Sequence, residues 1–166
     1  MTTSPLTEAD FRRALGQFTT GVTVVTIERE PGLVHGMTAN AFASVSLEPF
    51  LILVCIDLRA KMHSLLAEKA RFGVSVLGRG QQAISEYFAQ TEQSNDTERE
   101  LGISYRWLPN GVPVLENVLL QLNCVVCGSR LSGDHTIFIA EVESAEIYPG
   151  EPLLYFRGGY RQIAGN

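Results

Sequence analysis

Residues 36–49 read GMTANAFASVSLEP, a stretch of small side chains with three hydroxyls, one amide and almost no charge. This composition is unusual for a surface loop. Small side chains let the backbone approach a ligand closely, so that its N–H and C=O groups can hydrogen-bond a planar heterocycle. Further donors and acceptors come from the side chains of Thr38, Asn40, Ser44 and Ser46. The residues alone fit an ordinary Ser/Thr-rich connection equally well, so both interpretations stay open.

Extended segments lie on both sides of this stretch. Upstream, residues 22–27 are β-branched and apolar, and a Pro-Gly turn separates them from a second extended segment at 33–39, which predicts a hairpin. Further strands are predicted at 51–56, 72–77, 118–128, 136–148 and 153–156. About seven strands with few helices favour a closed or partly closed antiparallel barrel.

Helical signals are few. A sequence that resembles a capping box at 7–10 opens an amphipathic helix near the N-terminus. Two shorter helices are predicted near 62–66 and 81–89. The polar segment 90–104 has no strand period, so we expect a mobile excursion there and no core element.

The bulk composition fits one globular domain over residues 1–166. With 166 residues and 45% hydrophobic content, the chain can bury a core without metal or disulfide support. The net charge of −5 comes with no long block of either sign, which argues against a nucleic-acid partner. The N-terminus lacks the apolar segment of a signal peptide, and the longest apolar run, 50–56, is too short to span a bilayer. We therefore expect a cytoplasmic protein with no membrane partner.

The cysteine pattern fits reduced thiols. Three cysteines are an odd number, and they lie in apolar surroundings. Cys124 and Cys127 spell C-x-x-C, but QLNCVVCG is typical of a strand, where residues three apart point to opposite faces. Neither a disulfide nor a metal site is expected.

A glycine motif at 78–83, GRGQQA, matches G-x-G-x-x-A after a predicted strand. A dinucleotide-binding unit also needs a second parallel strand that ends in an acid about 20 residues further on. The sequence there, SNDTERE, has no apolar strand before its acids. We interpret the motif as a strand-to-helix turn with two permissive glycines.

Several segments resemble one known family in order along residues 11–160. They are TGVTVVT, GMTANAFASVSLEP, LVCID, FGVSVL, GDHTIFIAEV and PLLYFRGGY. The chain resembles the flavin reductase-like family, and TAN-x-F-x-SVS-x-x-P is its most specific part. The resemblance implies a mainly β fold, an antiparallel split β-barrel of the FMN-binding type, assembled as a homodimer. It also implies an enzyme that reduces FMN or FAD with NADH or NADPH and supplies a separate oxygenase, one that hydroxylates an aromatic substrate.

The resemblance implies two groups of residues around the flavin ring. The first group lies along the ring and ribityl chain, and the second lines the ring from the neighbouring strand. The groups are Met37, Thr38, Ala39, Asn40, Ala41, Ser44, Val45 and Ser46, and then Val54, Cys55 and Ile56.

The family also binds the flavin phosphate and the nicotinamide in defined segments. Arg59 and Lys61 would supply charge to the phosphate, and the helix that follows would offer N–H groups. Ala60 replaces a serine that is common there, which puts one phosphate contact in doubt. Phe88 is expected to close the pocket, and Arg157 to face the dinucleotide phosphates. The nicotinamide-contacting segment would be Tyr155, Phe156, Arg157 and Gly158.

His135 is the candidate catalytic residue. In similar proteins this histidine lies by the flavin face where nicotinamide stacks, although a structural role at the entry of a strand stays open. His35 and His63 have no partner motif and are interpreted as structural. Hydride transfer is chemistry that the two cofactors perform themselves, so no catalytic triad is required.

Two alternatives remain. An oxidase of the pyridoxamine-phosphate type would need a cluster of basic residues, of which only Arg59 and Lys61 stand close together. A non-enzymatic flavin-binding or flavin-sensing module would keep the TANAF segment without a nicotinamide site. The sequence does not choose between FMN and FAD, or between NADH and NADPH.

Overall fold

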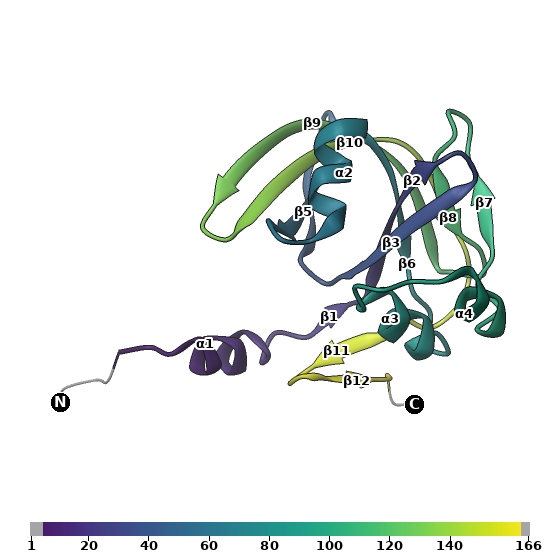
Figure 1. Ribbon diagram of the computed structural model, residues 1–166. Helices are drawn as coiled ribbons and strands as arrows, with labels where there is room; N and C mark the ends of the chain where they lie inside the picture. The colour runs from purple at the N-terminus through teal and green to yellow at the C-terminus, as the bar shows by residue number, and fades with distance from the viewer. Residues whose placement is uncertain (1–4, 164–166) are drawn as a thin grey trace.

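The computed structural model describes residues 5–163, and its main body is one curved antiparallel sheet (Figure 1). The strand order is β3-β2-β6-β9-β10-β5-β4, so β3 and β4 are its two edges. Because these edges follow one another in the chain and only Asn40 and Ala41 connect them, the sheet curls round into a barrel split between them. The predicted split barrel is confirmed. Its strands are β2 Thr23–Glu30, β3 Leu33–Ala39, β4 Phe42–Leu47, β5 Phe50–Asp57, β6 Arg71–Val76, β9 Leu120–Ser132 and β10 His135–Ile147.

The barrel encloses the main hydrophobic core. Val25 of β2 and Val54 and Ile56 of β5 are fully buried, because alternate side chains of each strand point inward. Helix α2 (Lys61–Lys69) packs against β2, β3 and β5 and buries Met62 and Leu66 in the same core. Burial of each such side chain contributes about 1.5–3 kcal/mol.

A second cluster forms below the barrel. It includes helix α3 (Gln82–Phe88) and a small sheet of β1 (Thr20–Gly21), β11 (Leu154–Phe156) and β12 (Gly159–Arg161). The ring of Phe88 lies directly against Gly36 of β3, where an added Cβ would come within 2.4 Å of it. Further along the chain are α4 (Asn95–Glu100), β7 (Tyr105–Trp107) and β8 (Pro113–Leu115).

Helix α1 (Glu8–Leu15) extends away from the barrel as an arm (Figure 1). The predicted cap is present, since Thr7 Oγ1 accepts a hydrogen bond of 3.1 Å from the backbone N–H of Asp10. The helix has no buried residue. Phe11, Leu15 and Phe18 are 52%, 58% and 76% exposed, so the apolar face of the arm is uncovered in a single copy of the chain.

Two segments differ from the sequence-based expectation. Residues 36–49 are not a loop, because they form the end of β3 and then the edge strand β4. The polar segment 90–104, expected to be an excursion without regular structure, contains helix α4. Ser94 caps this helix by accepting a hydrogen bond of 3.2 Å from the N–H of Thr97. The helix therefore begins at a capping hydrogen bond and needs no apolar pattern in the sequence.

The glycine motif and the C-x-x-C motif lie in ordinary elements of the fold. The strand before residues 78–83 is β6, whose neighbours β2 and β9 are both antiparallel to it, so no parallel dinucleotide-binding unit exists there. Cys124 is buried and Cys127 is exposed, at a register shift between β9 and β10. Within residues 5–163, no cluster of side chains suits a metal ion, and no helix is long and apolar enough to cross a membrane.

Candidate functional site

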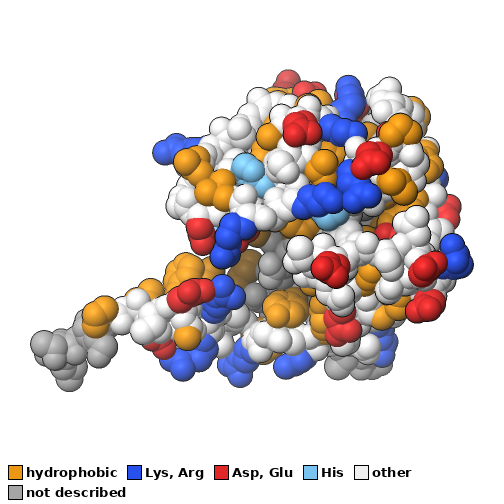
Figure 2. All heavy atoms as spheres, in the orientation of Figure 1, with side chains coloured by type: hydrophobic (Ala, Val, Ile, Leu, Met, Phe, Trp, Pro, Cys, Tyr) orange, Lys and Arg blue, Asp and Glu red, His pale blue; other side chains and the backbone are white. Residues whose placement is uncertain are grey.

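A cavity of about 700 Å³ lies where the split of the barrel meets helix α1. Figure 2 shows this region as a hollow between the arm and the barrel. Its volume is within the range of pockets that bind cofactor-sized ligands. The lining residues are Arg12, Leu15, Gly16, Phe18, Thr20, Asn40, Ala41, Phe42, Ala43, Leu53, Cys55, Tyr155 and Gly158.

The connection between the two edge strands forms one wall. The carbonyl of Ala41 accepts a hydrogen bond of 3.0 Å from the N–H of Cys55, and Thr23 Oγ1 donates one of 2.6 Å to the carbonyl of Ala39. These bonds hold the connection in place. Among the described residues, the backbone N–H groups of Asn40 and Ala41 have no hydrogen-bond partner. The wall therefore offers fixed donors between small, neutral side chains.

The sheet side of the cavity comes from β5. Leu53 and Cys55 point into the cavity, and the alternate residues Val54 and Ile56 point into the core. Burial raises the pKa of the Cys55 thiol, so it stays protonated and neutral at neutral pH. This wall therefore presents no charge to a ligand.

The opposite side comes from the two ends of the chain. Leu15 and Phe18 of the α1 region and Tyr155 of β11 line it. Arg157 joins these ends, because its guanidinium donates hydrogen bonds of 2.9 and 2.7 Å to Gln17 Oε1 and its N–H donates one of 2.9 Å to the carbonyl of Gly16. The predicted contact residue Arg157 is thus an exposed structural link at the mouth of the site.

A charged turn lies between β5 and α2. Arg59 donates to both oxygens of Asp57, at 3.1 and 2.7 Å, and the guanidinium holds the pKa of that carboxyl well below its usual range. Lys61 begins α2 without a carboxylate partner among the described residues. Ala60 is the N-cap and makes no side-chain cap, as the replacement of a serine implied. Anions bind well beside such helix starts.

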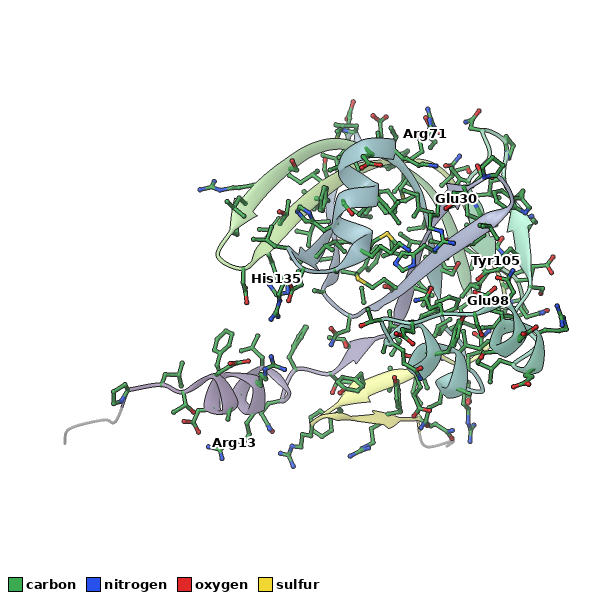
Figure 3. The ribbon with its side chains drawn as sticks, viewed as in Figure 1. Arg13, Glu30, Arg71, Glu98, Tyr105 and His135 are labelled. Carbon is green, nitrogen blue, oxygen red and sulfur yellow. The ribbon has the colours of Figure 1, made fainter. Side chains whose placement is uncertain are left out.

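His135 lies at the first position of β10, on the side of the barrel that faces α1 (Figure 3). It pairs with Asp57 across the sheet, and its Nδ1 is 2.7 Å from Asp134 Oδ1. This contact lowers the pKa of Asp134 and fixes the orientation of the ring. The side chain is 43% exposed and stands at the rim, beyond the residues that line the cavity.

The structure gathers only part of the predicted cofactor set. Asn40, Ala41, Cys55, Tyr155 and Gly158 line the cavity. Ser44, Val45 and Ser46 lie further along β4, on the surface. Met37, Ala39, Val54 and Ile56 pack in or against the core.

Thr38 and Phe88 also point elsewhere. The Thr38 hydroxyl donates a hydrogen bond of 2.6 Å to the carbonyl of Ser85, which ties β3 to α3. Phe88 is 1% exposed beneath Gly36, so it does not close the cavity.

Sequence reasoning missed several lining residues. Phe42 and Ala43 begin edge strand β4, which was not predicted. Leu53 alternates with the core residues Ile52 and Val54 of β5, and this period of two could have indicated it. Leu15 and Phe18 belong to the predicted apolar helix face, but no sequence signal shows that this face turns toward residues 40–43.

Comparison with known proteins places the chain among flavin reductases. A family model described as "flavin reductase like domain" matches residues 15–164. The NADH-dependent flavin reductase of Rhodococcus sp is 41% identical over 160 residues, which are 95% of this chain and 88% of that protein. The reductase component of a 4-nitrophenol 4-monooxygenase/4-nitrocatechol 2-monooxygenase from Rhodococcus opacus is 33% identical over 94% of this chain and 81% of that protein.

A solved structure of a flavin reductase has the same fold. The NADH:FAD oxidoreductase of Streptomyces globisporus, in complex with NAD and FAD fragments, superposes with a TM-score of 0.87. It is 36% identical and covers 99% of this chain and 97% of that one.

Proposed function

Because the chain belongs to the flavin reductase-like family, we propose that it reduces free FMN or FAD with NADH and passes the reduced flavin to a separate oxygenase. The observation that carries this proposal is the cavity of about 700 Å³, in which, among the described residues, Arg12, paired with Glu8, is the one charged lining side chain and two backbone N–H donors at Asn40 and Ala41 are unused. A flavin ring system needs such fixed donors along its polar edge and apolar walls on its faces.

The lining residues fit a flavin. Small side chains at Asn40, Ala41 and Ala43 leave room for a planar ring, and Leu53 and Phe18 give it apolar walls. The redox chemistry belongs to flavin and nicotinamide, between which a hydride passes. The residues of this chain therefore bind, orient and exclude water. Fixed N–H groups of the wall also stabilise negative charge on a reduced ring.

Charged and polar side chains outside the cavity are proposed to bind the flavin phosphate and the nicotinamide. Lys61 and Arg59 hold the flavin phosphate at the start of α2, with Arg59 exchanging its carboxylate partner for the phosphate. His135, oriented by Asp134, holds the nicotinamide, and Tyr155 packs beside it. These roles give NADH a place at the open side of the cavity. NADPH is the alternative co-substrate.

We also propose a homodimer. The apolar face of α1 is uncovered, and so are Val45, Leu47 and Phe50 on the β4–β5 hairpin, which are 46%, 83% and 63% exposed. Two such surfaces on each copy can cover one another in a two-fold assembly. Light scattering at micromolar concentration is expected to give the mass of a dimer, and a monomer mass would contradict it.

The partner is proposed to be an oxygenase that hydroxylates an aromatic substrate. One relative is the reductase component of a 4-nitrophenol 4-monooxygenase. We place both proteins in the cytoplasm, where NADH is supplied and thiols such as Cys55 stay reduced. Cell fractionation tests the location.

The two alternative functions predict different results in one assay. A reductase consumes NADH far beyond the amount of protein when free flavin is added, and only slowly without it. A flavin-binding module binds flavin and leaves NADH unchanged. An oxidase of the pyridoxamine-phosphate type consumes that substrate in place of NADH. NADH oxidation with FMN, FAD or no flavin, repeated with NADPH, separates these cases. Covalently bound flavin in the mass spectrum would contradict the release of reduced flavin.

A further inference from the structure

A second cavity, of about 360 Å³, lies beside the phosphate turn. It is bounded by edge strand β3, the start of α2 and the segment 91–98. Lys61 belongs both to this cavity and to the turn assigned to the flavin phosphate, so a ligand can continue from one to the other. Its lining residues are Arg29, Leu33, Val34, His35, Lys61, Thr91, Glu92, Gln93, Asn95 and Glu98.

One wall carries two cations, Lys61 and Arg29. Among the described residues Lys61 has no carboxylate within ion-pair distance. Arg29 forms an ion pair of 3.6 Å with Glu30, but its Nε is buried and has no hydrogen-bond partner, so it can still donate to a ligand. Burial and these two cations lower the pKa of His35 to about 4, so the ring is neutral at pH 7 and adds no charge. Figure 2 shows Lys and Arg side chains with a histidine on this face. Two such cations beside a cavity favour an anion.

The opposite wall carries acceptors and is held in place. Gln93 bonds the main chain of Gly36 in both directions, since Nε2 donates to the carbonyl at 2.7 Å and Oε1 accepts from the N–H at 3.3 Å. The Gln93 side chain thus holds the segment 91–98 against the edge of β3. This segment presents Asn95 and two carboxylates, Glu92 and Glu98, to the cavity. Such groups accept hydrogen bonds from ribose hydroxyls and from an adenine amino group.

We propose that this cavity binds the second phosphate and the adenosine of FAD, so that the chain takes FAD in preference to FMN. The assignment rests on the proposed function, because that function places the first flavin phosphate at Arg59 and Lys61. FMN ends at that phosphate. FAD continues with a second phosphate, which reaches Arg29, and then with an adenosine whose polar groups meet the far wall. The volume of the cavity suits a ligand of this size.

The test compares FAD with FMN by titration of flavin fluorescence, on the wild type and three variants. Arg29→Gln removes the cation, and Asn95→Trp fills the cavity from its far wall. Arg99→Gln is the control, because Arg99 lies on the same helix as Asn95, is 79% exposed and does not line the cavity. The wild type is expected to bind FAD about ten-fold more tightly than FMN. The first two variants lose most of this ratio through weaker FAD binding, and Arg99→Gln keeps it.

Equal affinity of the wild type for FAD and FMN would overturn the proposal. So would an Arg29→Gln variant with unchanged FAD affinity and a raised KM for NADH, because the cavity would then serve the adenosine of NADH. AMP added alone is expected to displace FAD more readily than FMN. Failure of the proposed function is distinguishable, because it would appear as loss of FMN binding and of FMN-dependent NADH oxidation in the wild type.

Discussion

Gly36→Ala tests how the fold supports the cavity wall. The added Cβ would lie 2.4 Å from two ring carbons of Phe88, whereas carbon atoms in contact are about 3.5–4.0 Å apart. Phe88 is 1% exposed in the cluster below the barrel, so its ring has little room to retreat. The strand must move instead, although Gln93 holds its main chain on the outer side. We expect a loss near the upper end of the roughly 1–3 kcal/mol typical of overpacking.

The assay is thermal unfolding together with flavin titration. A loss of about 3 kcal/mol corresponds to a Tm lower by roughly 6–12 °C in a domain of this size. Flavin affinity is expected to fall as well, because Asn40 is only four residues further along the same chain segment. Gly128→Ala is the matched control in strand β9, where an added Cβ has no neighbour within 4 Å. Phe88→Leu, added to Gly36→Ala, is expected to restore part of the flavin affinity. An unchanged Tm for Gly36→Ala would refute the reasoning.

Three further variants test the site and its support. His135→Ala is expected to lower kcat/KM for NADH by a few-fold to about a hundred-fold while flavin affinity holds, since a lost hydrogen bond costs about 0.5–3 kcal/mol; steady-state kinetics check it, and a joint loss of Tm and flavin binding would indicate a structural role. Asp57→Asn removes the carboxylate partner of Arg59 and is expected to strengthen FMN binding about two- to ten-fold at low salt. Weaker FMN binding in a fluorescence titration would contradict the proposal that Arg59 exchanges Asp57 for the flavin phosphate. The Arg71 guanidinium lowers the pKa of Glu143, so their ion pair stabilises the fold at pH values above the ordinary carboxyl pKa. This stabilisation is lost as pH falls through the lowered pKa. In Glu143→Gln, the free energy of unfolding, measured in urea at several pH values, should therefore fall less at acid pH than in the wild type.

The barrel was predictable because its strands carry strong local patterns. Residues 22–27 and 51–56 are long apolar or β-branched runs, and their burial in the core dominates any other local preference. Strand β4 was not predicted. Polar and apolar residues alternate from Ser44 to Leu47, but the apolar members Val45 and Leu47 are exposed at the edge of the sheet and mark no core-facing side. Its place is set by pairing with β5, which no local pattern records.

The candidate site was predictable in its first wall only. The small residues at Asn40 and Ala41 signal a close approach of the backbone, and they do line the cavity. The wall from α1 depends on how the two ends of the chain meet through Arg157 and Gln17, a contact between residues far apart in sequence. Phe88 shows the converse error, because an aromatic residue after a short helix can as well fill the core as a pocket.

The central claim, that flavin binds in the cavity beside Asn40 and Ala41, can be tested through the cysteines of the unaltered protein. Cys55 lines the cavity and is half-buried, Cys124 is fully buried, and Cys127 is exposed. Alkylation by iodoacetamide is followed at each cysteine by mass spectrometry, with and without saturating FMN, alongside FMN-dependent NADH oxidation. Cys127 should react rapidly in both conditions and Cys124 in neither. Cys55 should react slowly, because burial raises its pKa, and FMN should protect both the thiol and the activity. An unchanged rate of Cys55 alkylation in saturating FMN would contradict the account.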